Sequence, residues 1–380
     1  MHSRAIEMSC PCGRRLMAQW MAFLLAIVSL GVTTSGNAAD ANPLFQSDEV
    51  LKAVLTAPIA QAYDQRDQEV RIYIPGQWAY VDDDGQAKRI EVSIRTRGNF
   101  RREYCSLPPL QLNFKKSQVK KTLFAGQDKL KLVAPCKSGV RFRQYVILEY
   151  LAYRTLEILT DYSFKTRLLR LTYVDSEEKL DPWTDIVFLI EDDSDVAKRL
   201  GLERIKIPRI EFDELDREKT ALAELFQFLV ANNDYSVLRA AEGEDCCHNV
   251  EVMVGEGPDG PRIPIPFDFD MSGLVNASYA APPSHLPIRD VRFPYYTGLC
   301  HPPGVLEAAI AHANSKREEI FALFSNSEEL NPKVKSKALM MVENFFNVIN
   351  TPKRKRRELD DHCRGKKLLA EMLNPTKDST

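Results

Sequence analysis

The sequence predicts an α+β fold with an antiparallel sheet in the N-terminal half and mostly helices in the C-terminal half. Short segments in which apolar and polar residues alternate recur between residues 70 and 190, as half-buried strands do. Long amphipathic segments follow at residues 305–324 and 332–349. A chain of 380 residues can bury a large core, either as one two-lobed unit or as two domains.

The N-terminal half begins with a polar stretch and a predicted helix over residues 49–63. Five strands are then expected, at residues 70–74, 78–81, 90–97, 110–114 and 129–133. In residues 90–97, Ile90, Val92 and Ile94 alternate with polar residues, which is typical of a strand with one buried face.

A strongly amphipathic helix is predicted over residues 141–160. Two strands follow at 168–174 and 186–190, and the short loop between them favours an antiparallel pair. Residues 198–216 are highly charged, and we expect a mobile connection there. The sheet-rich half would therefore end near residue 191.

The C-terminal half contains an apolar helical segment that ends near residue 229. Two strand-like runs at 250–254 and 263–267 flank a turn rich in Gly and Pro, which predicts a hairpin. Besides the two long amphipathic segments, a final helix is expected near residues 359–373.

Residues 1–38 have the pattern of a secretory signal peptide. Arg14 and Arg15 precede an apolar run at 21–32, and small residues lead to Ala38 and Ala39. We therefore expect export to the periplasm or the medium, with an uncleaved anchor as the alternative. No later run is apolar enough to cross a bilayer. The net charge of −2 gives no argument for nucleic-acid binding.

Export changes the interpretation of the cysteines, because disulfides persist in oxidising compartments. Six cysteines follow the predicted signal peptide: Cys105, Cys136, Cys246, Cys247, Cys300 and Cys363. We favour a Cys105–Cys136 disulfide, and a second one between Cys300 and either Cys246 or Cys247. A zinc site is the competing interpretation, but no CxxC pair supports it.

Oxygen-bearing side chains gather at the ends of the elements around the predicted hairpin. Asp234 follows the helical segment, Asn249 precedes the first strand, and Asp268 and Asp270 follow the second. Carboxylate and amide oxygens are the ligands that Mg²⁺ and Mn²⁺ prefer, and an aspartate near such an ion can accept a proton from a hydroxyl nucleophile. Taken singly, each residue could instead be a helix cap or a turn residue.

The order of these motifs resembles the CotH-like atypical kinases, the spore-coat protein H family. In that family a catalytic Asp precedes a His-Asn pair and a strand that ends in a DxD-like metal site. The matching residues here are Asp234, His248-Asn249 and Asp268-Phe269-Asp270. Upstream, Arg97-Gly98-Asn99 resembles the family's RGN segment, and the likeness spans about residues 90–275.

The resemblance implies a bilobed, atypical protein-kinase-like fold. Residues 39–191 would form a nucleotide-binding N-lobe with an antiparallel sheet, and residues 192–380 a mixed, largely helical C-lobe. The enzyme would transfer the γ-phosphate of ATP to a hydroxyl on a protein or small molecule, with Mg²⁺ or Mn²⁺. Two alternatives stay open: an inactive kinase-like binding or structural protein of the cell envelope, and a metal-dependent phosphoester hydrolase.

The expected roles follow from the same resemblance. Asp234 would be the base or would orient the nucleophile, and Asn249 and Asp268 would hold the metal with support from Asp270. Four further residues would serve the nucleotide: Arg97, Lys131, Glu149 and Glu191. A helical glutamate paired with a strand lysine would suit this role for Glu149 and Lys131.

Overall fold

The computed structural model describes residues 42–373, except 83–84, 241–244, 256 and 258. Asp40–Thr380 forms one compact unit, and all descriptions below concern that unit. The predicted signal peptide, residues 1–38, lies outside the described residues.

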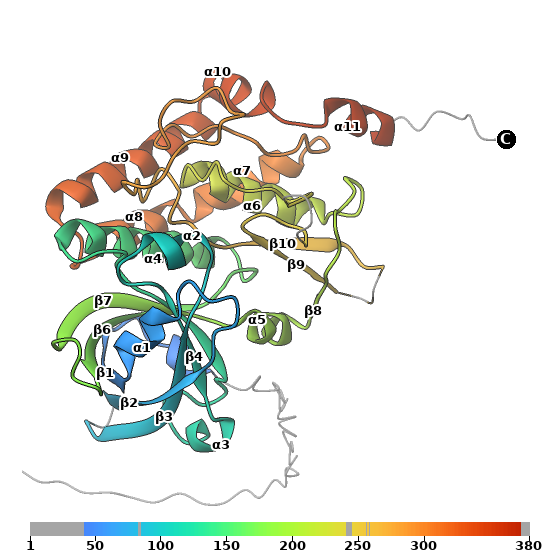
Figure 1. Ribbon diagram of the computed structural model, residues 1–380. Helices are drawn as coiled ribbons and strands as arrows, with labels where there is room; N and C mark the ends of the chain where they lie inside the picture. Colours follow the sequence, from blue (N-terminus) through green and yellow to red (C-terminus); the bar gives the residue numbers. More distant parts are fainter. Residues whose placement is uncertain (1–41, 83–84, 241–244, 256, 258, 374–380) are drawn as a thin grey trace, which may run out of the picture. The chain divides into compact units, whose positions relative to one another are not determined.

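A closed, mixed β-barrel of seven strands forms the first half of this unit (Figure 1). Its order is β1-β2-β3-β4-β5-β7-β6, in which β1 and β6 are parallel and the other pairs are antiparallel. The strands are β1 (Leu51–Ala57), β2 (Ile74–Val81), β3 (Ala87–Thr96), β4 (Leu110–Phe114), β5 (Lys129–Val133), β6 (Thr166–Asp175) and β7 (Trp183–Ile190).

The predicted fold class, a bilobed kinase-like fold with an antiparallel sheet as its N-lobe, is therefore wrong. The decisive element is β1, which the sequence analysis placed in a helix over 49–63. Its residues alternate between barrel core and surface, and it pairs with β2 on one side and β6 on the other. This double pairing joins the two ends of the sheet, and closure leaves no strand edge exposed.

The barrel interior is filled by aromatic and aliphatic side chains. The rings of Trp78, Phe114 and Phe124 contact one another, with centroids 5.0–6.2 Å apart, and all three are almost fully buried. Helix α1 (Ile59–Asp64) follows β1, and the Asp175 carboxylate at the end of β6 accepts a hydrogen bond of 2.7 Å from the amide of Ile59. The barrel is thus a packed core.

Helix α4 (Val140–Leu159) packs against β7 of the barrel and against the helices of the C-terminal half. Its buried Tyr153 contacts Phe188 of β7 and Phe269, which follows the hairpin. A second core formed in this way joins the barrel to the rest of the unit.

The charged segment predicted as a mobile connection is partly ordered as regular structure. Asp192 caps the N-terminus of helix α5 (Asp193–Leu200), because its carboxylate accepts a hydrogen bond from the amide of Ser194. Strand β8 (Glu203–Arg204) then pairs with β9. The high charge of this segment reflects exposed faces on ordered elements.

The C-terminal half combines a small sheet with helices (Figure 1). Strands β9 (Val250–Val254) and β10 (Arg262–Pro266) form the predicted antiparallel hairpin. The main helices are α6 (Arg217–Leu229), α7 (Val305–Ser315), α8 (Arg317–Ser325), α9 (Pro332–Ile349) and α11 (Lys366–Leu373). The shorter elements are η1 (Pro43–Phe45), α2 (Phe100–Tyr104), α3 (Lys116–Val119), α10 (Pro352–Lys355) and η2 (Arg356–Asp360).

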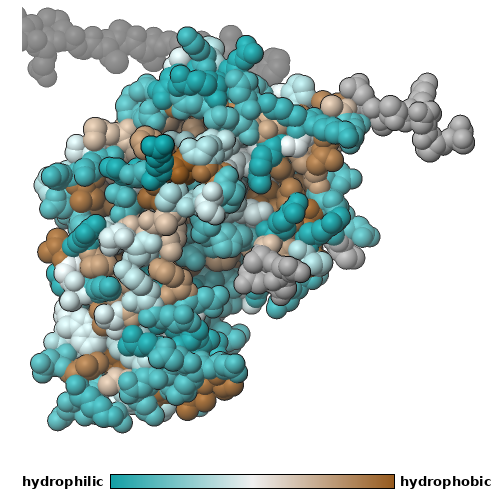
Figure 2. Space-filling view, turned by 45° about the horizontal axis from the view of Figure 1, so that its top comes forward, coloured by the Kyte–Doolittle hydropathy of each residue, from teal (hydrophilic) through white to brown (hydrophobic). Residues whose placement is uncertain are grey.

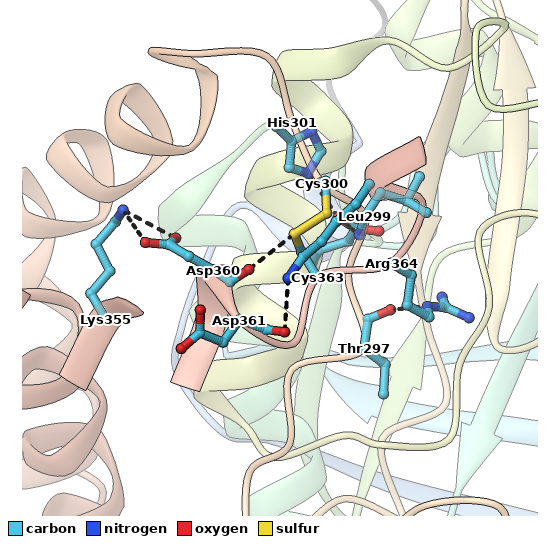
Figure 3. Close-up of a disulfide and its surroundings, with 11 residues drawn as sticks. Thr297, Leu299, Cys300, His301, Lys355, Asp360, Asp361, Cys363 and Arg364 are labelled. Carbon is cyan, nitrogen blue, oxygen red and sulfur yellow. Dashed lines mark hydrogen bonds and ion pairs between the residues drawn. A yellow bond between two sulfur atoms is a disulfide. The ribbon is translucent and has the colours of Figure 1, made fainter. Parts of the chain in front are cut away.

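Three disulfides pair the six cysteines that the structure describes. The predicted Cys105–Cys136 bond is present. The prediction of a bond from Cys300 to Cys246 or Cys247 is wrong, because those two neighbours are joined to each other and Cys300 pairs with Cys363. Figure 3 shows how the last bond ties the chain before α7 to the chain after η2.

The face of the molecule shown in Figure 2 is largely hydrophilic, with apolar residues in separate patches. Within residues 42–373, apart from the short gaps named above, no helix combines the length and the apolar character that a bilayer span requires.

Candidate functional site

A pocket of about 440 Å³ lies where the barrel, α2, α4 and the β9–β10 hairpin meet. Seven of the eight predicted site residues line it: Arg97, Lys131, Glu149, Asp234, Asn249, Asp268 and Asp270. The eighth, Glu191, is absent from the lining. The volume falls within the range of about 300–1,000 Å³ that small-molecule sites occupy.

Asp234, His248 and Asn249 form a connected group on one wall. His248 Nε2 lies 2.9 Å from Asp234 Oδ1, and the amide nitrogen of Asn249 donates to the main-chain oxygen of Asp234 at 2.7 Å. Both the Asp234 and His248 side chains are about two-fifths exposed, at 38% and 44%. A carboxylate held beside an imidazole and open to the pocket can accept a proton from an incoming hydroxyl.

The hairpin brings Asp268 close to this group. Asn249 directly precedes β9 and Asp268 follows β10, and the amide of Phe267 donates to the main-chain oxygen of Asn249 at 3.1 Å. Asn249 and Asp268 both have left-handed backbones, with φ of 52° and 62°, which Asn and Asp tolerate better than most residues. Tyr153 Oη accepts a hydrogen bond of 2.9 Å from the amide of Asp268 and so fixes the turn.

The carboxylate of Asp268 is exposed into the pocket. It makes no hydrogen bond or ion pair with any residue that the structure describes. An anionic group in this position, beside the further carboxylates of Asp234 and Asp270, favours a cationic ligand.

A buried charge cluster lies deeper in the pocket. Arg101 of α2 forms an ion pair of 3.0 Å with Glu149 of α4 and lies 3.8 Å from a carboxylate oxygen of Asp270. Tyr279 donates a hydrogen bond of 3.1 Å to Asp270, while Arg101 also donates to the main-chain oxygen of Ala134. This cluster rigidly joins α2, α4 and the segment after β10.

Burial sets the titration of this cluster. Loss of hydration raises the pKa of Glu149 above its ordinary value, and the positive charge of Arg101 only partly opposes that effect. Burial and the nearby charge of Asp268 raise the pKa of Asp270. Arg101 opposes the rise in the pKa of both acids, because its positive charge favours the ionised form of each.

Lys131 and Arg97 give the pocket its other positive charges. Lys131 of β5 forms an ion pair with Asp193 at the start of α5 and lies over the rings of Phe164 and Phe267. The strand lysine thus pairs with an acid of α5, and Arg101 takes the place at Glu149 that the sequence analysis considered for a lysine. Arg97 precedes the left-handed Gly98 and makes no side-chain hydrogen bond or ion pair within the described part of the chain.

Glu191 is buried next to the pocket and is fully engaged by other groups. Its carboxylate forms a two-point ion pair with Arg199 and accepts a hydrogen bond from the amide of Lys165. These contacts tie the end of β7 to α5, so its visible role is to hold the elements around Lys131.

Arg101, Tyr153 and Tyr279 contribute to this site but were not identified from the sequence. Arg101 lies only four residues after Arg97, and a second arginine beside the Arg-Gly-Asn turn was the available clue. The sequence offered no clue to the roles of Tyr153 and Tyr279, because buried aromatic residues are common in any core.

The donors present fit a divalent ion held by few protein ligands. The Asn249 side-chain nitrogen is engaged, its side-chain oxygen accepts no hydrogen bond within the described residues, and the Asp268 carboxylate is the second possible donor. No three His, Cys, Asp or Glu side chains within the described ranges are grouped closely enough to hold a metal ion. Mg²⁺ keeps several water or phosphate ligands, so Asn249 and Asp268 suit an ion that arrives with a phosphate.

No family model matches this chain, and no curated protein matches it. The resemblance to CotH-like kinases consequently stays a prediction based on the order of short motifs.

Proposed function

We propose that this protein is a phosphotransferase that moves the γ-phosphate of a nucleoside triphosphate to a hydroxyl group, with Mg²⁺ or Mn²⁺. The observation that carries the proposal is the gathering of seven predicted residues in one pocket whose lining contains both carboxylates and cations. The proposal does not depend on a kinase fold, because chemistry resides in a site and several folds can host the same site.

In this mechanism Asp234 accepts the proton of the acceptor hydroxyl. The hydroxyl oxygen forms a new bond to the γ-phosphorus, the bond from that phosphorus to the bridging oxygen breaks, and the nucleoside diphosphate leaves with the electron pair. His248, 2.9 Å from Asp234, holds the carboxylate in place. Positioning and charge stabilisation of this kind account for most of catalysis in phosphoryl transfer.

Other residues of the lining supply groups for the phosphates and the base. Arg97 and Lys131 are suited to phosphate oxygens, and Arg101 keeps its pair with Glu149. Val133, Ile190 and Phe267 offer apolar surface for a base. A divalent ion held by Asn249 and Asp268, with Asp270 behind them, would neutralise charge on the phosphates.

The test is incubation of the purified protein with γ-labelled ATP and Mg²⁺ or Mn²⁺, with and without candidate hydroxyl acceptors. Label transferred to protein or acceptor supports the phosphotransferase, whereas labelled free phosphate alone supports a phosphoester hydrolase. The exposure of Asp234 and His248 favours this second function, because water can reach the same carboxylate. Neither product, with no nucleotide binding, would leave a non-catalytic binding protein.

Two variants and one control sharpen the test. Asp234→Asn and Asp268→Asn are each expected to lower transfer by ~10²-fold or more, the scale of a lost general base or metal ligand. Asp361→Asn changes an exposed carboxylate whose one ion pair within the described residues is with Arg356 at 3.9 Å, and transfer should stay unchanged. Equal transfer by all three variants would refute the assignment of the site.

Export of the protein belongs to the same proposal. Three disulfides within the described residues are typical of an oxidising compartment. The nucleotide would then have to be present outside the cytoplasm, and recovery of the protein from a periplasmic or culture-medium fraction tests this point.

A further inference from the structure

A second pocket, of about 680 Å³, is lined by a later part of the segment that follows β10. It is lined by the N-terminal part of α4, residues 273–276 and the N-terminal part of α9. It shares no lining residue with the candidate active site. The two pockets are therefore separate binding volumes.

The inner surface of this pocket is apolar. It is formed mainly by aliphatic and thioether side chains: Leu148, Leu274, Val275, Val334, Ala338 and Met341. Leu148 and Leu274 are almost fully buried, while Met340 at the rim is 61% exposed. A deep apolar volume with an exposed apolar rim binds the body of an apolar or amphipathic molecule.

The charged residues of the lining all have the same sign. Arg141, Arg292, Lys333 and Lys337 line the pocket, and the lining contains no Asp or Glu. Arg292 is neutralised by Asp290, with its Nε 2.9 Å from a carboxylate oxygen. The other three form no ion pair with a residue in the described ranges, and Arg141 donates only to the hydroxyl of Tyr145. Uncompensated positive charge at the mouth of an apolar pocket attracts an anion.

The walls of the pocket are held in place without a ligand. Both polar atoms of the Gln144 side chain are engaged, since its nitrogen donates to the main-chain oxygen of Glu329 and its oxygen accepts from the amide of Asn331. The amide of Gly273 donates to the main-chain oxygen of Ala231, and the amide of Leu274 donates to that of Val230, just after α6. A preformed site loses less conformational entropy on binding.

We infer that this pocket binds a small amphipathic anion, a carboxylate on an alkyl chain of the fatty-acid type. The chain would occupy the apolar volume, and the carboxylate would lie between Lys333, Lys337 and Arg141. The complementarity of charge selects an anion over a cation, and the depth of the apolar surface selects a chain over a small ion. This inference is independent of the phosphotransferase proposal.

Calorimetric titration with three probes tests the inference. Dodecanoate carries the charge and the chain, dodecylammonium the same chain with opposite charge, and acetate the charge alone. We expect dodecanoate to bind ~10-fold or more tightly than dodecylammonium, which corresponds to about 1.4 kcal/mol, and acetate to show no measurable binding. Equal binding of the two long-chain probes, or no binding of dodecanoate, would overturn the inference.

The double variant Lys333→Glu/Lys337→Glu locates the anion. Both lysines are exposed on α9, so the fold should persist, and far-ultraviolet circular dichroism checks it. The variant should reverse the preference and bind dodecylammonium more tightly, a result that a general loss of stability cannot produce. Lys335→Glu is the matched control, because this residue of the same helix donates to the main-chain oxygen of Ser325 outside the pocket. An unchanged preference in the double variant would refute the placement.

Discussion

Substitution of Arg101 by methionine removes the one cation that lies between two buried carboxylates. The Glu149 side chain is 3.0 Å from Arg101 and the Asp270 side chain 3.8 Å, and these residues are only 2% and 4% exposed. Removing one partner of a buried pair leaves an uncompensated charge and costs about 3–5 kcal/mol. We expect Arg101→Met to lower the free energy of unfolding by that amount near pH 8.

The pH dependence gives this prediction its distinguishing feature. The pKa of Glu149 is raised in the folded state, so above a pH of about 4.3 this side chain binds more protons in the folded than in the unfolded protein, and its contribution to stability falls as pH rises. Without Arg101 the pKa of Glu149 and of Asp270 rises further, because the cation no longer opposes the effect of burial. The destabilisation should therefore be largest at alkaline pH and shrink towards pH 5, where both acids are neutral.

The assay is urea denaturation of wild type and variant between pH 5 and pH 8. Arg170→Met is the control, since its partner Glu329 lies at a partly exposed surface and such pairs contribute about 0–1 kcal/mol. Arg101→Met/Glu149→Leu should recover part of the loss by removing one stranded charge. A loss of stability that is the same at pH 5 and pH 8 would refute this account of the cluster.

Two further predictions concern stability. Replacement of Cys300 and Cys363 by serine opens a disulfide between residues 63 apart, and chain entropy predicts a loss of about 4 kcal/mol in the free energy of unfolding, measured as a lower urea midpoint. For Cys105→Ser/Cys136→Ser the separation of 31 residues predicts a slightly smaller loss. An unchanged midpoint in either double variant would contradict the prediction. Gly273→Ala would place a Cβ 2.3 Å from the main-chain oxygen of Val291, so the free energy of unfolding should fall by ~1–3 kcal/mol or more. The variant should also lose binding of dodecanoate, because Gly273 lines the second pocket. A stable variant with normal binding would show that this turn can shift.

Much of the local structure followed from the sequence alone. The strands Leu110–Phe114, Lys129–Val133 and Val250–Val254 and the helix Pro332–Ile349 occur within the predicted limits. Their alternating or helical patterns are long and clear, and polar turns or a proline mark their ends. The Cys105–Cys136 bond was also predicted, but the partners of the other cysteines depended on distant segments meeting.

The sequence predicted most of the residues that line the candidate pocket but only part of their contacts. Short-range motifs identified Asp234, Asn249 and Asp268, because local spacing and turn chemistry are visible along the chain. The partner of Glu149 was not identified from the sequence, since Arg101 is 48 residues away and only the packing of α2 on α4 brings the two side chains together. The same limit explains why Glu191 was predicted to line the nucleotide site but does not line the pocket. Its ion pair with Arg199 depends on how α5 packs.

The sequence by itself predicted seven residues that line the candidate pocket and most of the strands and helices, since motifs and periodicity depend on neighbours within a few positions. Only the tertiary structure decided that the sheet closes into a barrel, because Leu51–Ala57 becomes a strand through pairing with β2 and β6, which lie elsewhere in the chain. Pairing between distant segments depends on long-range packing that outweighs local propensity, and no local pattern records it.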